Sequence, residues 1–240
     1  MFPQRDQFPM TPIVMIPGLL CSAELYAPQM AALWPFGSVT VASTLSGTTM
    51  SEIATNILRD APPSFALVGL SMGGYVALEI MRQAPERVSK LALLDTSARP
   101  DTQEQVAQRR GMLAQAKGGD FNELLSQVMS ILLHPAHRDD QHLLEVNIRM
   151  GLTVGVEGFE RQTEAIIGRA DSCPHLADIT VPTLVLVGDC DSITPPFLSK
   201  EIAAAIPDSS LVIIPKCGHG STLEQPEAVN RALVTWLEGA

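Results

Sequence analysis

Short apolar runs that recur along the chain constrain its fold more than any other feature. Each run consists of aliphatic or β-branched residues that would be apolar on both faces of a strand, and helix-like segments lie between the runs. Such runs are typical of parallel strands covered by helices on both sides, and their alternation with helices indicates βαβ units. The runs are residues 13–16, 39–41, 65–68, 91–94, 184–187 and 211–214. We therefore expect an α/β fold with an open, mostly parallel sheet.

Between Asp101 and Ala170 the apolar runs stop, and the pattern becomes that of consecutive helices. The predicted helices are residues 102–117, 121–133, 140–152 and 156–167. Helix breakers separate them at Gly118-Gly119, at His134-Pro135 and at Gly151 with Gly155. We expect this block to be an insertion over one edge of the sheet.

Two further helices are visible outside the insertion. The first covers residues 72–84 and stops before Pro85, because proline disfavours helical geometry in the preceding residue. Near the C-terminus, Ser221 and Glu224 have the spacing of a capping box. An apolar stripe at helical spacing follows, which we expect in the core: Val229, Leu233, Trp236 and Leu237.

Composition and charge exclude several classes of protein. Lysine and arginine number 16 against 26 aspartates and glutamates, a net charge of −10, which opposes binding to a phosphate backbone. With 46% hydrophobic and 18% charged residues, the chain is globular in composition. The apolar run of residues 13–20 is broken by Pro17 and Gly18 and is shorter than the roughly 20 residues that cross a bilayer. We expect neither a nucleic-acid partner nor a membrane partner.

The N-terminus and the cysteines indicate a compartment. The first ten residues lack the charged, apolar and small-residue regions of a secretory signal. The four cysteines, Cys21, Cys173, Cys190 and Cys217, are scattered without a CxxC pair, which argues against a zinc site and against a disulfide framework. Free thiols suit a reducing environment, so we expect a cytoplasmic protein with no bound metal.

The segment from Phe65 to Tyr75 carries the most chemical information. An apolar strand runs through Gly69-x-Ser71-x-Gly73 into a helix, the pattern of a nucleophile elbow. The sharp turn projects the serine hydroxyl, and glycine is required on either side because larger side chains would collide. The alternative is a glycine-rich turn with a solvent-facing serine. The strand before the motif and the helix after it favour a catalytic Ser71.

A serine hydroxyl is a poor nucleophile unless a base removes its proton, so a histidine is required. Four of the histidines, His134, His137, His142 and His175, lie in or beside the helical insertion, where a surface or capping role is the default. His219 lies in a glycine-flanked loop after the run 211–214, at the carboxyl edge of the predicted sheet. Loops at that edge carry the active sites of open α/β folds. We therefore choose His219 as the base.

The histidine needs a carboxylate that fixes its tautomer. Asp189 and Asp191 both follow the run 184–187, and Asp95 follows the run 91–94 at the same edge. Asp191 is favoured, because the residues after it can turn the chain toward His219. For Asp189, at the strand exit, a turn-forming role is the alternative. Asp95 is the second choice for the acid.

An oxyanion formed at Ser71 needs backbone donors. The helix that begins after the serine supplies the N–H of Met72 and the positive end of its dipole. The second donor should come from the loop after the first strand, where we choose the N–H of Leu19. An ordinary glycine turn is the alternative for that loop.

Taken together, these segments resemble the alpha/beta-hydrolase superfamily over nearly the whole chain. The motifs are GLSMGG at residues 69–74, GDCDSITPP at 188–196 and CGHGSTLEQP at 217–226, in the chain order serine, acid, histidine. The likeness is greatest to small, capped, cofactor-free hydrolases such as carboxylesterases, enol-lactonases and the pimeloyl-carrier methyl-ester esterase. The resemblance implies a nucleophile, acid and base at Ser71, Asp191 and His219, with backbone donors at Leu19 and Met72.

The same resemblance implies how the domain is divided. Residues 1–100 and 171–240 would form the hydrolase core, and residues 101–170 the helical cap. Because the chain starts close to its first strand, where larger relatives begin with an antiparallel hairpin, about six parallel strands with helices on both faces are implied. Many relatives carry His-Gly in the oxyanion loop, whereas this chain has Pro17-Gly18, so support of the loop by a histidine is missing.

We expect a serine hydrolase that cleaves an ester or thioester of a small-to-medium apolar acyl compound, without a cofactor. The expected cap is rich in apolar side chains, more than half of which should pack in its core: Met112, Leu113, Phe121, Leu124, Leu125, Val128, Met129, Ile131 and Leu132. Its arginines could meet an anionic group, but we expect them at the solvated surface: Arg109, Arg110, Arg138, Arg149, Arg161 and Arg169. Two alternatives stay open, a lyase or carbon–carbon bond hydrolase with the same triad, and a non-catalytic receptor.

Overall fold

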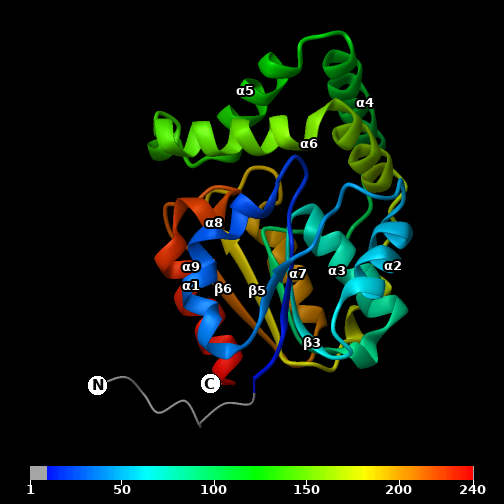
Figure 1. Ribbon diagram of the computed structural model, residues 1–240, viewed down its shortest axis with the longest axis vertical. Coiled ribbons are helices and arrows are strands. Elements are labelled where there is room, and N and C mark those ends of the chain that lie inside the picture. The colour runs from blue at the N-terminus through cyan, green and yellow to red at the C-terminus, as the bar shows by residue number, and fades with distance from the viewer. Residues whose placement is uncertain (1–9, 240) are drawn as a thin grey trace.

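One parallel sheet forms the centre of the molecule (Figure 1). The computed structural model describes residues 10–239, apart from the side chains of Met129 and Ser130. The sheet has six strands in the order β2-β1-β3-β4-β5-β6, and every neighbouring pair is parallel. The strands are β1 (Ile13–Ile16), β2 (Val39–Val41), β3 (Phe65–Leu70), β4 (Val88–Leu94), β5 (Thr183–Gly188) and β6 (Ser209–Ile214). The fold class and all six predicted strands are confirmed.

Alternate side chains along a strand point to opposite faces of the sheet, and each face packs in its own apolar layer. Val14 and Ile16 pack with α2 (Met50–Asp60), α3 (Met72–Gln83) and α7 (Pro196–Ala205). Ile13 and Met15 face the opposite layer, which contains α1 (Ala27–Leu33) and α9 (Pro226–Glu238). The helices therefore cover both faces of the sheet (Figure 1).

Burial is complete in three of the four inner strands, whereas the fourth, β4, exposes Ser89 and part of Lys90, and the edge strands are only partly buried. Every residue of β1, β3 and β5 is buried. The expected cover on both faces is incomplete for β6, where Leu211 and Ile213 remain partly exposed. Because β6 is an edge strand, its outward side chains have a neighbouring strand on one side only.

The insertion consists of α4 (Gln103–Lys117), α5 (Phe121–Leu132) and α6 (Gln141–Ile167), which Figure 1 shows above the rest of the molecule. The predicted break at Gly151 is wrong, because α6 continues through this residue. The predicted break at Gly155 is confirmed, because its φ of 67° and ψ of 175° lie outside the helical region and the chain bends there. Gly151 is needed for packing, since a Cβ there would lie 2.4 Å from the Leu125 side chain.

The C-terminal segment corrects one prediction and confirms another. Ser221 and Glu224 do not form a capping box, because Gly220 precedes the short helix α8 (Ser221–Glu224) and both side chains bind elsewhere. The apolar stripe of α9 is buried as expected, with Val229 and Leu233 fully so.

Two predictions concern membranes and secretion. Across residues 10–239, no helix combines the length and apolarity that a bilayer crossing requires. The absence of a secretory signal was expected from the first ten residues, and residues 1–9 lie outside the described part of the chain.

Candidate active site

Ser71 occupies a strained turn between β3 and α3. Its backbone has φ 54° and ψ −116°, which is unusual for any residue except glycine. The flanking glycines are sterically required, as expected. A Cβ at Gly69 would lie 2.3 Å from the carbonyl oxygen of Gly73, and a Cβ at Gly73 would lie 2.0 Å from that of Ile16. The local sequence thus forces the serine side chain out of the sheet edge.

The structure brings Ser71, His219 and Asp191 into one hydrogen-bonded row. Nε2 of His219 lies 2.8 Å from Oγ of Ser71, and Nδ1 of the same ring lies 2.8 Å from Oδ2 of Asp191. These distances suit proton transfer from the hydroxyl to the imidazole. Asp191 is itself fixed, because its Oδ1 accepts the N–H groups of Ile193 and Thr194 at 2.8 and 2.9 Å.

Thr194 is a contributor that the sequence analysis did not identify. Its hydroxyl donates to Oδ2 of Asp191 at 2.8 Å and lies 3.3 Å from Nδ1 of His219. The signal was weak, since a threonine three residues after an aspartate is common in turns. Thr194 therefore supplies the second hydrogen bond to Oδ2 of the buried Asp191 carboxylate, beside the one to His219.

Burial and charge set the protonation of this row. Burial opposes the charged form of His219, but the Asp191 carboxylate outweighs this effect and raises the pKa of the imidazole above its ordinary value. Burial also opposes ionisation of Asp191, but His219 and the hydrogen bonds from Thr194 hold the pKa of that carboxyl below its ordinary value. Both shifts stabilise the imidazolium that forms when His219 takes a proton, relative to an imidazole without this carboxylate partner.

Of the three candidate aspartates, all in the described chain, Asp191 is the one hydrogen-bonded to His219. Asp95 is fully buried, where Oδ1 accepts the N–H of Gly188 at 3.0 Å and Oδ2 accepts the Ser221 hydroxyl. Burial, followed by the nearby charge of Asp191, raises the pKa of Asp95 to about 8. Asp189 accepts the N–H of Cys217 at 3.1 Å, joining the loops after β5 and β6.

The backbone segments that carry the two predicted oxyanion donors lie beside Ser71. Met72 is the first residue of α3, whose first N–H groups have no acceptor within the helix. The loop of Leu19 also lies against Ser71, because a Cβ placed on Gly18 would be 3.4 Å from Cβ of Ser71. Both backbone segments are therefore adjacent to the place where an oxyanion would form.

Glu224 binds the backbone of the loop that carries His219, a role that the predicted capping box did not indicate. Its side chain is fully buried, and Oε1 accepts the N–H groups of Gly218 and Gly220 at 3.0 and 3.3 Å. Oε2 accepts the N–H of His134 at 2.8 Å and lies 2.9 Å from Nδ1 of His137. The carboxylate therefore joins the residues on both sides of the histidine to the segment that follows α5.

Contacts from the insertion reach the same loop directly. The N–H of His219 donates to the carbonyl of Leu132 at 2.7 Å, and the Ser192 hydroxyl donates to the carbonyl of Ile131 at 2.9 Å. The end of α5 is thus attached to the loops that carry the acid and the base.

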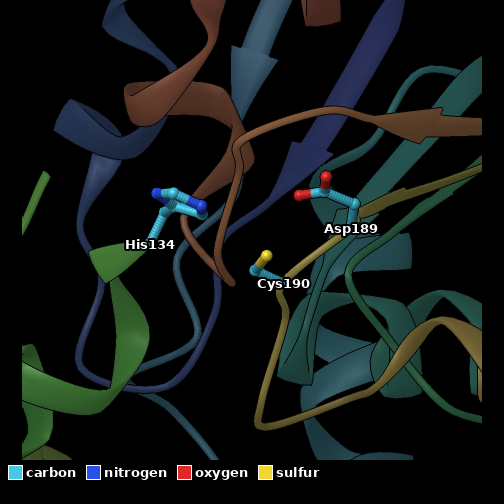
Figure 2. Close-up of side chains that lie close together, drawn as sticks. All are labelled: His134, Asp189 and Cys190. Carbon is cyan, nitrogen blue, oxygen red and sulfur yellow. The ribbon is translucent and has the colours of Figure 1, made fainter. Parts of the chain in front are cut away.

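A group of metal-ligating types lies beside these loops (Figure 2). The side chains of His134, Asp189 and Cys190 offer ligand atoms that all lie within 4.8 Å of one another. Nδ1 of His134 already accepts the N–H of Ala136 at 3.0 Å, and Asp189 already accepts from Cys217. A cation would have to use Nε2 of His134, which moves the ring proton to Nδ1 and breaks the bond from Ala136. We assign no metal to this group.

His142 and His175 are exposed, as expected, and the His134 side chain caps a turn by accepting the N–H of Ala136. His137 departs from the surface role, because its Nδ1 lies 2.9 Å from the buried carboxylate of Glu224. The arginines of the insertion depart from expectation in part. Arg169 is nearly buried, with 7% of its side chain exposed, and pairs with Asp101 at 2.7 Å and with the Tyr75 ring at 4.2 Å. Arg109 binds the same aspartate. Arg110 and Arg149 form exposed pairs with Glu164 and Glu24, Arg161 bonds the carbonyl of Leu45, and Arg138 is exposed.

The apolar side chains of the insertion form their own cluster, as expected. Leu113, Leu124 and Leu125 are buried there, and Met112, Phe121 and Val128 pack against them. The side chain of Met129 lies outside the described residues. Ile131 is exposed.

Comparison with known proteins agrees with this architecture. The model of the alpha/beta hydrolase family matches residues 13–232. A solved esterase from Thermogutta terrifontis is 29% identical with a TM-score of 0.86, covering 97% of this chain and 91% of that chain. An enol-lactonase from Burkholderia xenovorans has the same fold, with 24% identity, a TM-score of 0.86 and 97% and 93% coverage.

A curated relative is also similar in sequence. The pimeloyl-[acyl-carrier protein] methyl ester esterase of Pectobacterium carotovorum is 27% identical over 198 residues, which are 79% of this chain and 76% of the relative. Such relatives support a hydrolase activity for this chain. On the family match and the shared fold, the chain belongs to the alpha/beta hydrolase family.

Proposed function

We propose that this protein is a serine hydrolase that cleaves an ester or thioester of a small-to-medium, largely apolar acyl compound. The observation that carries the proposal is the row from Ser71 through His219 to Asp191, with 2.8 Å at each link. A strained serine, a buried imidazole and a carboxylate with every lone pair engaged are what a nucleophilic mechanism needs.

The reaction would proceed in two halves. In the first, His219 takes the proton of Ser71 as Oγ attacks the acyl carbon, and then gives that proton to the leaving oxygen or sulfur. In the second, His219 takes a proton from water as the water oxygen attacks the acyl carbon, and then gives that proton to Oγ of Ser71 as the acyl–Oγ bond breaks and the acid leaves. Asp191 stabilises the imidazolium in both halves, and the N–H groups of Leu19 and Met72 donate to the oxyanion. No cofactor enters either half.

The substrate class rests on the apolar insertion next to the site. Leu19 packs against the cluster of Leu124 and Phe159, so apolar side chains extend from the expected cap to the oxyanion loop. The Phe121 and Phe159 rings lie 6.2 Å apart in this cluster. We therefore propose residues 101–170 as a cap that receives an apolar acyl group, over a core of residues 1–100 and 171–240. The cytoplasmic location expected from the cysteines stays a prediction.

Ester hydrolysis by a Ser71→Ala variant tests the proposal. Wild type should hydrolyse p-nitrophenyl acetate, butyrate or octanoate, and Ser71→Ala should lose at least about 10³-fold in kcat because the attacking group is gone. Ser210→Ala, at an exposed position of β6, is the matched control and should keep wild-type activity. Equal rates for wild type and Ser71→Ala would exclude the hydrolase and favour the receptor. A lyase would leave Ser71 unacylated while turning over its own substrate.

A further inference from the structure

The loop that carries Leu19 contains a residue in strained geometry. Leu20 has φ +60°, a left-handed conformation that costs a non-glycine residue energy. Its side chain is buried in the apolar cluster of the insertion, with Leu113 and Phe159. The loop therefore needs an interaction that holds its backbone in this conformation.

Gln162 of α6 provides that interaction. Its Oε1 accepts the N–H of Leu20 at 3.0 Å, across 142 residues of sequence. Its Nε2 donates to the Thr44 hydroxyl at 2.9 Å. Gln162 is fully buried and Thr44 nearly so, which means that breaking either bond would leave a polar group unsatisfied in the interior.

The N–H of Leu20 that Gln162 binds determines which part of the loop this contact fixes. It belongs to the peptide unit that joins Leu19 to Leu20, so fixing it fixes the plane that follows Leu19. The other side of the same plane is held by the Cys21 thiol, which donates to the Leu19 carbonyl at 3.4 Å. The start of the loop is held by the Tyr26 hydroxyl, which donates to the carbonyl of Ile16 at 2.9 Å. The Leu19 N–H itself lies in the preceding peptide unit, whose Gly18 carbonyl accepts the N–H of Cys21 at 3.2 Å, so contacts on both sides of Leu19 restrict its direction.

We infer that Gln162 is a positioning residue that aims the Leu19 N–H at the oxyanion and makes this aim dependent on the insertion. The inference rests on the proposed function. It also explains how a loop with Pro17-Gly18, which has no histidine side chain to brace it, keeps its geometry. Gln162 on α6 braces the loop in place of a histidine. Displacement of α6 would therefore free the Leu19 N–H from its fixed direction.

Two substitutions separate positioning from packing. Gln162→Met keeps the length of the side chain and removes the acceptor. Gln162→Glu keeps an acceptor for the Leu20 N–H and offers a second oxygen to the Thr44 hydroxyl. Gln108→Met, at an exposed position of α4, is the matched control.

The readouts are kcat and KM for p-nitrophenyl butyrate, and the inhibition constant of an alkyl trifluoromethyl ketone, whose adduct with a serine carries an oxyanion. Rates are expressed per site labelled by a fluorophosphonate, which removes the effect of unfolded protein. Gln162→Met should lose about 10- to 100-fold in kcat with KM changed less than about threefold, and its ketone affinity should fall in parallel with kcat/KM. Gln162→Glu should stay within about fivefold of wild type.

Failure of this inference differs from failure of the proposed function. Wild-type kcat and ketone affinity per labelled site in Gln162→Met, together with an inactive Ser71→Ala, would overturn the positioning role alone. Equal loss in Gln162→Met and Gln162→Glu would reduce the residue to a packing role and overturn it as well. Full activity in Ser71→Ala would overturn both.

Discussion

Nδ1 of His219 lies 2.8 Å from Oδ2 of Asp191, although 28 residues separate the two in sequence. Sheet topology explains the approach. Asp191 follows β5 and His219 follows β6, and these strands are parallel neighbours, so both loops leave the sheet at the same edge. The N–H of Cys190 donating to the carbonyl of Cys217 at 2.9 Å joins the two loops further.

Removal of the base should be as damaging as removal of the nucleophile. His219→Ala should lose on the order of 10⁴-fold or more in kcat for p-nitrophenyl butyrate, because Ser71 then has no proton acceptor. The double variant Ser71→Ala/His219→Ala should be hardly slower than either single variant, since the two residues act as one unit. Steady-state kinetics of the three variants measure this coupling. Losses that multiply would show that the residues act independently.

The choice of acid gives a second prediction. Asp191→Asn should lose on the order of 10⁴-fold in kcat in a folded protein, because an amide cannot stabilise the His219 imidazolium. Asp189→Asn and Asp95→Asn should keep most of the activity, since neither carboxylate bonds the imidazole. Turnover and melting temperature of the three variants decide between them. An active, folded Asp191→Asn would contradict the assignment.

The buried Asp95 should make stability depend on pH. Its pKa is about 8 in the folded protein and about 4 in the unfolded chain. Below about pH 4 the carboxyl is protonated in both states and does not reduce the free energy of unfolding. As the pH rises from about 4 to about 8, the unfolded chain has lost this proton while the folded protein keeps it, so the free energy of unfolding decreases. Asn cannot titrate, so the melting temperature of wild type should fall relative to Asp95→Asn between pH 4 and pH 9. Thermal melts at several pH values measure the difference.

Asp189 provides the control for this titration. Burial opposes the ionisation of Asp189, but the hydrogen bonds from the backbone of Cys217 and Lys216 together outweigh it and lower the pKa of this carboxyl. Wild type should therefore lose stability relative to Asp189→Asn only as the pH falls below about 4, which is the opposite sign, and the difference should stay constant between about pH 4 and pH 9. A pH-independent difference between wild type and Asp95→Asn would contradict the account of the buried carboxyl.

Loss of Glu224 should destabilise the fold. Glu224→Ala removes the acceptor of N–H groups at Gly218, Gly220 and His134, and the free energy of unfolding should fall by about 2–4 kcal/mol. Urea unfolding of this variant and of Glu227→Ala, an exposed position on α9, measures the difference. Equal stability of Glu224→Ala and Glu227→Ala would contradict the role given to the buried carboxylate.

The strands and the row of site residues could be predicted because their signals are local. An apolar run followed by Gly69-x-Ser71-x-Gly73 specifies a strand, a turn and a helix, and parallel topology then gathers the loops of Asp191 and His219. Gln162, which the sequence did not reveal, and Glu224, which it misassigned, depend on contacts between distant segments. Gln162 meets Leu20 across 142 residues, and Glu224 meets His134 across 90, so neither has a pattern along the chain. Glu224 also fitted a capping box, a local alternative that tertiary contacts override.

The bend in α6 shows a similar limit. Gly151 and Gly155 are equivalent as helix breakers in sequence, but one sits against the Leu125 side chain inside a continuous helix and the other adopts a positive φ. Packing against α5 decides which glycine bends the chain. Tertiary contacts also explain why Arg169 is buried although an exposed side chain is predicted. The Asp101 carboxylate and the Tyr75 ring stabilise its guanidinium charge in the interior.

Covalent labelling of Ser71 tests the central claim most directly. A fluorophosphonate should add one phosphonyl group to the intact protein, and peptide mass spectrometry should place it on Ser71 of the peptide that contains residues 69–74. His219→Ala should label at least about 100-fold more slowly, because the serine then lacks its base. An unlabelled protein, or a label on any residue other than Ser71, would contradict the account.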